Sequence, residues 1–130
     1  MNWIDQALGV HPAALAFRSE RGAVLAANIA NSATPGYRAR DYDFQKALQQ
    51  EMKGQNVGMQ STHANHISTN SSNDYGGLLY RVPTRFSSND NTVEADVEQA
   101  AFAENAMHYQ ASLQFLNGSI SGLRKAITGK

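Results

Sequence analysis

The chain has 130 residues, with 11 Lys and Arg residues against 11 Asp and Glu residues, and no cysteine. This length suits one small domain, and the lack of cysteine excludes a disulfide framework and a thiolate metal site. The balanced charge lacks the basic excess of duplex-binding proteins, and the longest apolar stretches are too short to span a membrane. The first residues have neither a basic region nor a long apolar run, so we expect no cleaved secretory signal.

The first predicted element is a helix over residues 3–32. Pro12 interrupts this segment. Because proline lacks a backbone N–H and clashes with the preceding helical turn, we expect the helix to start or kink there. Residues at heptad spacing form its main stripe, and two apolar residues form a second one: Leu8, Leu15, Gly22, Leu25 and Ile29, then Phe17 and Val24.

The helix should end at an Asn-rich turn within residues 28–37. Asn31 and the serine after it can bond to the local backbone, which disfavours further helix. Pro35 and Gly36 fit a type II turn, since Pro fixes φ and Gly supplies a positive φ. We expect Tyr37 to anchor the reversed chain against the helix.

Residues 54–77 differ in kind from both ends of the chain. They are mainly Gly, Asn, Ser, Thr and Gln. Such a stretch cannot bury enough apolar surface to offset the entropy of ordering it, so we expect a loop, or disorder in the free chain. Residues 78–82 are predicted to form a short strand that Pro83 ends.

The chain carries no motif typical of catalysis or cofactor binding. His63 and His66 have the H-x-x-H spacing of metal sites, but no third or fourth ligand is evident, so we interpret them as part of a solvated loop. Asp41 and Asp43 flank Tyr42 without a nucleophile or acid partner nearby. No nucleophile elbow, phosphate-binding glycine loop or zinc-protease motif occurs. We therefore expect no enzyme activity, no catalytic, cofactor or metal site and no small-molecule substrate.

Residues 93–128 are predicted to form a long helix. Its start should be capped by Asp90 or Asn91, and acidic residues at the start and basic residues at the end suit the helix dipole. Eight residues are spaced alternately four and three apart, which is the a/d seam of a coiled coil. They are Phe102, Ala106, Tyr109, Leu113, Leu116, Ile120, Leu123 and Ile127.

A second face of this helix carries small residues and one methionine. They are Ala100, Met107, Ala111, Gly118 and Gly122. Either these are tolerated surface positions, or the helix packs against two neighbours at once.

The two ends of the chain carry opposite charge. Residues 6–40 contain four arginines and one glutamate, whereas residues 86–123 contain five acidic residues and no Lys or Arg. Pairing of the two ends is therefore favoured electrostatically. Each exposed pair contributes only about 0.2–1 kcal/mol, so charge sets the orientation more than the stability.

Residues 26–37, AANIANSATPGY, resemble the N-terminal signature of flagellar rod, hook and related axial proteins. Other segments resemble the flagellar basal-body rod protein family, and within it the FlgB-type proximal rod subunits: residues 38–44, 78–83, 91–94, 102–106 and 109–113. The resemblance covers nearly the whole chain. One departure lies in residues 89–93, NDNTV, where family members often have a glycine in place of Asp90. This substitution leaves open which turn precedes the last helix.

The resemblance implies a mainly α fold, in which the N- and C-terminal helices form an antiparallel coiled coil around an irregular, partly β or disordered middle. Residues 1–33 and 93–130 would be the helices of the rod core, and residues 34–92 a linker and loop region with a short possible strand. The two stripes would be assembly seams, and Asn28, Asn31, Thr34, Pro35, Gly36 and Tyr37 would form the signature turn.

The resemblance also implies a role, partners and a place. The chain would be a structural subunit of the tubular drive shaft, which transmits torque, surrounds the export channel and is needed for motility. Its partners would be other copies of itself, other rod proteins, a FliE-type adaptor, the MS ring and the type III export gate, with no nucleic acid. It would be exported by the flagellar type III system without a cleaved signal and assemble into the periplasmic rod of the basal body.

Phe44 and Leu48 resemble the F-x-x-x-hydrophobic motif that the export gate recognises. At i and i+4 of a helix the two side chains share a face. The alternative is a short amphipathic helix that packs on its own protein.

A different functional class is also open for the whole chain, namely a soluble coiled-coil adaptor or export chaperone of a type III secretion system. Such a protein would fold and dimerise in the cytoplasm, whereas a rod subunit would stay largely unfolded until it assembles.

Overall fold

The structure is a computed structural model that describes residues 3–53 and 77–129. The described residues form four helices and two short strands. In chain order the elements are α1 (Trp3–Leu8), α2 (His11–Ala30), β1 (Arg40–Asp41), α3 (Phe44–Lys53), β2 (Leu79–Tyr80) and α4 (Ala95–Thr128). The predicted mainly α fold is confirmed. His63, His66 and the predicted polar loop lie outside the described residues.

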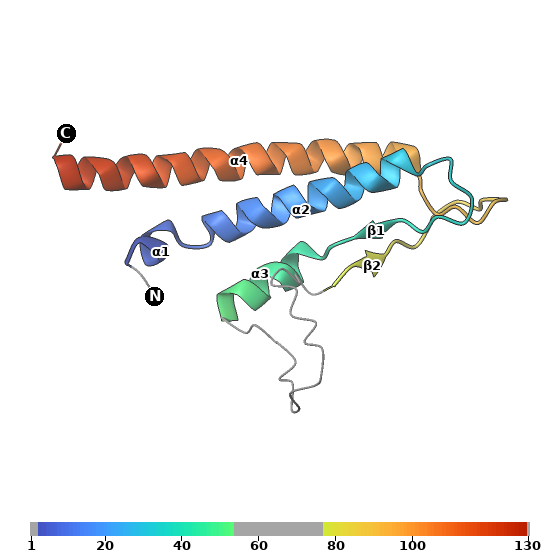
Figure 1. The fold of residues 1–130 in the computed structure, drawn as a ribbon, viewed down its shortest axis with the longest axis horizontal. Coiled ribbons are helices and arrows are strands. Elements are labelled where there is room, and N and C mark those ends of the chain that lie inside the picture. The colour runs from blue at the N-terminus through green and yellow to red at the C-terminus, as the bar shows by residue number, and fades with distance from the viewer. Residues whose placement is uncertain (1–2, 54–76, 130) are drawn as a thin grey trace, which may run out of the picture.

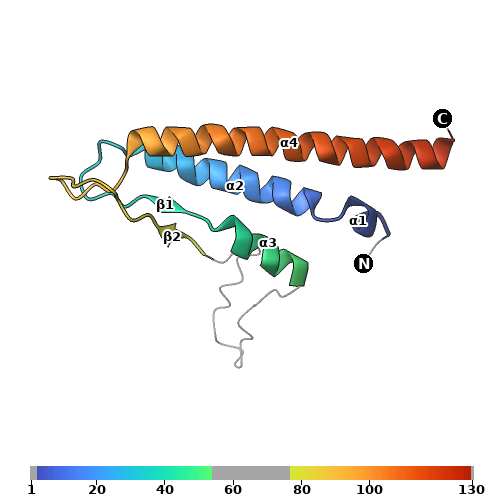
Figure 2. The same ribbon diagram turned by 180° about the vertical axis from the view of Figure 1, so that it is seen from behind.

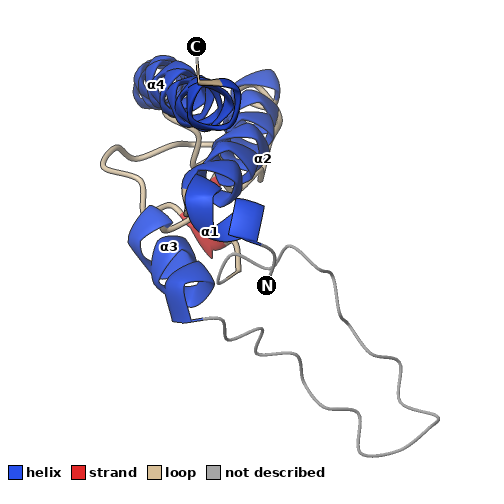
Figure 3. Ribbon diagram, turned by 90° about the vertical axis from the view of Figure 1, so that its left-hand side faces the viewer, coloured by secondary structure: helices blue, strands red, loops and turns tan. Residues whose placement is uncertain are grey.

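The architecture is a long antiparallel helix pair with a smaller layer on one side. Helix α4 runs the length of the molecule, and α2 lies along it in the opposite direction (Figure 1). The β1–β2 ribbon and α3 lie on the far side of α2 from α4, as the reverse view also shows (Figure 2). Viewed along the helix axes, α4, α2 and α3 form three successive tiers (Figure 3). Helix α1 and the end of α4 lie at the same end of the molecule (Figure 1).

The predicted break at Pro12 is confirmed. Helix α1 ends at Leu8, and Gly9 then takes a positive φ of 58°. Helix α2 begins at His11 with Pro12 in its first turn, where the missing N–H would have no helical partner anyway. The predicted single helix over residues 3–32 is therefore two helices.

The predicted strand is also present, as β2. It pairs antiparallel with β1, with Arg40 opposite Tyr80 and Asp41 opposite Leu79. This two-stranded ribbon brings the segment after the Asn-rich turn next to the segment before α4.

The predicted cap of the last helix is wrong. Helix α4 starts at Ala95, and neither Asp90 nor Asn91 reaches its first turn; the capping position is Glu94, whose side chain makes no capping bond. Asp90 instead takes the left-handed conformation, with φ of 58°. Aspartate tolerates this conformation better than most residues with a Cβ, which explains how the turn forms without a glycine there.

Few apolar side chains are buried. The buried hydrophobic residues of the described chain are Phe17, Leu25, Ala39 and Ala47. Phe17 and Ala47 pack with Tyr42 and Phe44 between α2 and α3. Several polar side chains are as deeply buried as these, so polar contacts carry much of the specificity of the fold.

Candidate functional site

The Asn-rich turn has the geometry that the sequence predicts. Asn31 ends α2, and its side-chain amide donates to the Ala27 carbonyl oxygen at 2.8 Å. The Tyr37 N–H donates to the Thr34 carbonyl oxygen at 3.3 Å, and Gly36 has φ of 71°. Both features agree with a type II turn centred on Pro35 and Gly36.

Asn91 holds this turn in place. Its buried side-chain amide donates to the carbonyl oxygens of Asn31, Ser32 and Thr34 at 3.0, 3.0 and 2.7 Å. These carbonyl groups lie at and beyond the end of α2, where helical partners are missing. A residue 60 positions away in sequence from Asn31 therefore fastens the turn. Asn91 therefore binds the end of α2, and not the start of α4 as its position in the sequence predicts, because local spacing gives no sign of such a distant contact.

Asn28 connects three elements from a fully buried position on α2. Its amide group donates to the Arg40 carbonyl oxygen at 2.7 Å and to Glu98 Oε2 at 3.0 Å, and its Oδ1 accepts from the Arg40 N–H at 3.1 Å. The side chain thus bonds both backbone groups of Arg40, as a neighbouring strand would. This arrangement fixes β1 against α2 and ties both to α4.

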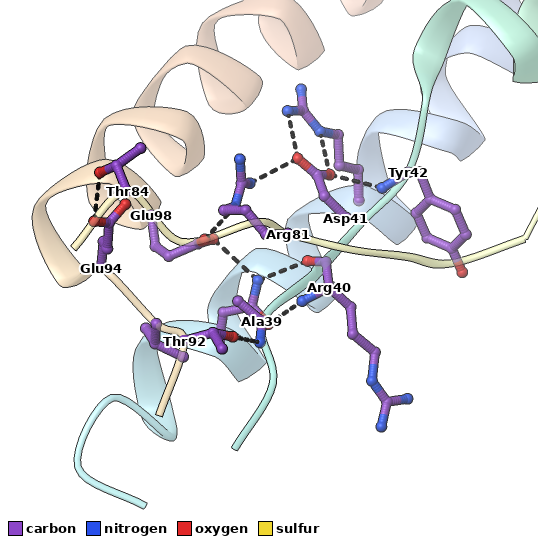
Figure 4. Close-up of polar contacts among 12 residues, drawn as sticks. Ala39, Arg40, Asp41, Tyr42, Arg81, Thr84, Thr92, Glu94 and Glu98 are labelled. Atoms are coloured by element: carbon purple, nitrogen blue, oxygen red, sulfur yellow. Dashed lines mark hydrogen bonds and ion pairs between the residues drawn. The ribbon is translucent and has the colours of Figure 1, made fainter. Parts of the chain in front are cut away.

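Arg81 completes the network between Asp41 and Glu98 (Figure 4). Its guanidinium lies 2.8 Å from Asp41 Oδ2 and 2.6 Å from Glu98 Oε1, and Glu98 is 0% exposed. Arg21 makes a bidentate contact with the same Asp41, at 2.8 and 3.0 Å. We call Arg21, Asn28, Asp41, Arg81, Asn91 and Glu98 the polar junction.

The electrostatics of the polar junction keep Asp41 ionised. Burial alone would raise the pKa of the Asp41 carboxyl group, but the hydrogen bonds from Arg21, with the charges of Arg21 and Arg81, outweigh burial and hold that pKa below its ordinary value. The hydrogen bond to Asp41 correspondingly raises the pKa of Arg21. Among the described residues no ion pair joins α2 directly to α4. Arg81 bridges Asp41 and Glu98, and the carboxylates of Glu98 and Glu104 on α4 add a smaller attraction to Arg21.

Phe44, from the proposed export motif, packs on α2 in the folded chain. Its ring lies 5.2 Å from that of Phe17, and the Arg18 guanidinium lies 3.9 Å above it. Burial lowers the pKa of Arg18. Leu48, on the same helix, is half-buried. The folded chain therefore uses α3 as an amphipathic packing helix.

Helix α4 faces α2 along a line that differs from the predicted seam. Its most buried positions are Glu98 and Asn105, seven residues apart, and Asn105 donates to the Arg18 carbonyl oxygen at 2.8 Å. Here the helices approach closely: a Cβ on Gly22 would lie 3.2 Å from the Asn105 amide nitrogen. In contrast, a Cβ on Gly118 or Gly122 would meet no atom within 4 Å.

The predicted seam is consequently divided between two environments. Leu8 on α1 and Leu15 and Ile29 on α2 are half-buried, and Leu25 on α2 is buried. On α4, Tyr109, Leu116 and Leu123 are half-buried. The remaining five seam residues are exposed along α4, with Ile127 at 71%. We call these five the apolar stripe: Phe102, Ala106, Leu113, Ile120 and Ile127.

The described residues offer no group of three or more His, Asp or Glu side chains that could hold a metal ion. Within those residues, every helix is too short or too polar to cross a bilayer. Two features of the described residues stand out: the polar junction at one end of the α2–α4 pair, and the apolar stripe that extends along α4 toward the other end.

No protein-family model matches the chain. Individual curated proteins match nearly all of it. The flagellar basal body rod protein FlgB of Aeromonas hydrophila is 43% identical over 128 residues, which cover 97% of this chain and 96% of the relative. FlgB of Cereibacter sphaeroides (strain ATCC 17029 / ATH 2.4.9) is 46% identical over 123 residues, and FlgB of Salmonella typhimurium is 39% identical over 132 residues; these matches cover at least 94% of each chain. The chain therefore belongs to the FlgB family of flagellar basal body rod proteins and is a structural subunit of the rod.

Proposed function

We propose that this subunit assembles through the apolar stripe of α4, with other copies of itself and with other rod proteins, into the periplasmic rod. The observation that carries the proposal is the exposure of five apolar residues at heptad-related spacing along a helix of 34 residues. A soluble monomer gains nothing by exposing such a stripe, whereas an assembled subunit buries it. Each large apolar side chain that becomes fully buried contributes about 1.5–3 kcal/mol.

The family relationship supports a rod subunit over a soluble adaptor or export chaperone. As a drive-shaft component the protein would transmit torque and enclose the export channel, without catalysing a reaction. We further propose that its neighbours at the base of the rod include a FliE-type adaptor and the MS ring, because the resemblance in residues 38–44 and 78–83 is to proximal rod subunits.

Leu113→Asp tests the assembly proposal. Leu113 belongs to the apolar stripe and is exposed in the single chain, so the new charge becomes costly only where a neighbour buries it. In a strain that lacks its own FlgB-type subunit, the wild-type chain should restore rods and motility, and Leu113→Asp should not. Glu104→Ala, at an exposed position away from the seam, is the matched control and should restore both. Equal rod numbers with both variants would contradict the proposal.

For export we propose the flagellar type III system, with Phe44 and Leu48 as the pair that contacts the gate in the unfolded chain. Phe44→Ala combined with Leu48→Ala should reduce secretion into the periplasm while synthesis stays normal. The folded structure supplies the competing explanation, because Phe44 packs on Phe17 and Arg18. Normal secretion with failed assembly would assign the pair to packing alone.

A further inference from the structure

A groove opens between α2 and α4 beside the first part of the apolar stripe. Its volume is about 550 Å³, and its lining includes Ser19, Gly22, Phe102, Ala106, Met107 and Tyr109. The lining is nearly free of charge: it includes Arg18, but the guanidinium of Arg18 lies over the Phe44 ring. Two aromatic rings, a thioether and small side chains make a surface that suits an apolar, preferably aromatic, group.

A candidate for that group lies on the loop that follows β2. Phe86 is 96% exposed and makes no ring or cation contact with the described residues. The other strongly exposed aromatic residues are engaged, because Phe115 stacks on His11 and Tyr80 lies beside two arginines. Phe86 is thus an aromatic side chain that its own chain leaves in solvent.

Side chains next to Phe86 tie its loop to the residues at the start of α4. On one side of it, Thr84 Oγ1 donates to Glu94 Oε1 at 2.6 Å, and Arg85 lies 3.3 Å from Asp96. On the other side, Ser87 Oγ bonds to Asn89 Oδ1 at 2.5 Å. The loop projects beyond the adjacent ends of α2 and α4 (Figure 1). A tethered loop loses less conformational entropy on binding than a free one, which favours its use as a contact.

We infer that Phe86 of one copy inserts into the α2–α4 groove of a neighbouring copy. The inference rests on the proposed assembly function and names the segment that fills the first part of the apolar stripe. The loop and the groove are different surfaces of one chain, so the contact is heterologous, and such contacts can repeat along an open helical assembly. A buried Phe ring removes on the order of 150–250 Å² from solvent, which gives this contact the area of an interface anchor.

Disulfide trapping tests the inference directly, because the chain has no cysteine of its own. Cysteine is a small apolar side chain, so Phe86→Cys should still form rods. Combined with Ala106→Cys it should give disulfide-linked dimers and longer ladders when those rods are oxidised, and neither single variant should. Phe86→Cys combined with Ser19→Cys tests the opposite wall of the groove. The matched control is Phe86→Cys with Phe115→Cys, since Phe115 is exposed on α4 but does not line the groove.

A second readout uses side-chain chemistry. Phe86→Ser should lower the number of completed rods at least tenfold, and Phe86→Leu should retain most of them, because leucine still fills an apolar groove. Wild-type rod numbers with Phe86→Ser, or rods in which neither groove pair is trapped, would overturn the inference. Equal trapping at Phe115→Cys would overturn it as well. If the wild-type chain itself fails to restore rods to a deficient strain, the proposed function is what fails.

Discussion

The two ends of the α2–α4 pair are built on different principles. At the end where α2 stops and α4 starts, buried and half-buried polar side chains from four segments contact one another, with Glu98 accepting from Asn28 and pairing with Arg81. Toward the other end, α4 carries exposed apolar residues and glycines beside open space. The polar contacts at the first end form within a single chain, whereas the apolar surface at the other end is exposed and would be covered by a neighbouring subunit.

This difference separates folding from assembly. Buried polar groups are costly unless every partner is in place, so the polar junction specifies one arrangement of the chain. Apolar contacts are not directional, so the apolar stripe can pack on the surfaces of neighbouring subunits. A chain with four buried hydrophobic residues among those described has little core of its own, and assembly would supply the rest.

The largest effect is expected from a charge placed in the apolar stripe, and it should affect one end of the α2–α4 pair without the other. Ile120→Asp should abolish rod assembly, because a neighbour would have to bury the new charge. It should leave the polar junction unchanged, since Ile120 is 48% exposed in the single chain. Rod counts by electron microscopy, together with amide exchange at Ala39 and Thr92, measure the two effects. Loss of protection at those amides would show that the two ends are not independent.

Glu98→Ala disrupts the polar junction, at the opposite end of the α2–α4 pair. Removing one partner of a buried ion pair costs about 3–5 kcal/mol, because the remaining charge and donor stay buried. The Thr92 N–H donates to the Tyr37 carbonyl oxygen, and the Ala39 N–H donates to Thr92 Oγ1. If the full cost appears at these sites, both amides should exchange roughly 150- to 5,000-fold faster, since about 1.4 kcal/mol is tenfold. Glu98→Gln keeps an acceptor for Asn28 and should be milder; equal effects would mean that the charge of Glu98 is unimportant.

Gly36→Val is expected to have a smaller effect. A Cβ at this position meets no atom within 4 Å, so the cost comes from the positive φ alone. That cost is roughly 1–2 kcal/mol. Assembly should fall more than secretion, since export handles an unfolded chain, and Pro35→Ala should be weaker still. Secreted subunit and completed rods, measured side by side, decide the matter. Wild-type rod numbers in Gly36→Val would show that assembly does not need this turn.

The smallest expected effect is the pH dependence of the polar junction. The pKa of Asp41 is lower in the folded chain than the unfolded value of about 3.9. Its contribution to stability is therefore fully present above the unfolded pKa, and it is lost as the pH falls through the folded pKa. Helix content followed by circular dichroism down to about pH 2 should show an acid-induced loss that is smaller in Asp41→Asn. An identical acid profile in both proteins would exclude Asp41 as its source.

Local features of the fold could be predicted from the sequence. Proline and glycine act on their immediate neighbours, so the start of α2 near Pro12 and the turn at Gly36 follow from single residues. The helix predicted over residues 93–128 is observed as Ala95–Thr128, and the strand predicted over residues 78–82 is observed as the shorter Leu79–Tyr80. The residue types themselves carried enough information at these places.

Contacts between distant segments could not be predicted in this way. Glu98 and Asn105 are polar and suggest a solvated helix face, yet they form the line that meets α2. The heptad pattern marks apolar residues without indicating which partner each one contacts, and on α4 only Tyr109, Leu116 and Leu123 of the predicted seam are half-buried in the single chain. Asn91 and Arg81 gave no local signal, because their partners lie in segments that only the tertiary fold brings near.

Amide exchange of the free subunit, compared with that of assembled rods, is the most direct test of whether the polar junction forms within one chain and the apolar stripe is ordered by neighbouring subunits. We expect the backbone amides beside the polar junction, at Gly36, Ala39 and Thr92, to be the better protected in the free subunit. Amides around Leu113, Ile120 and Ile127 should gain protection only in rods. Equal protection along α4 in both states would contradict the account, because the apolar stripe would then need no neighbour to order it.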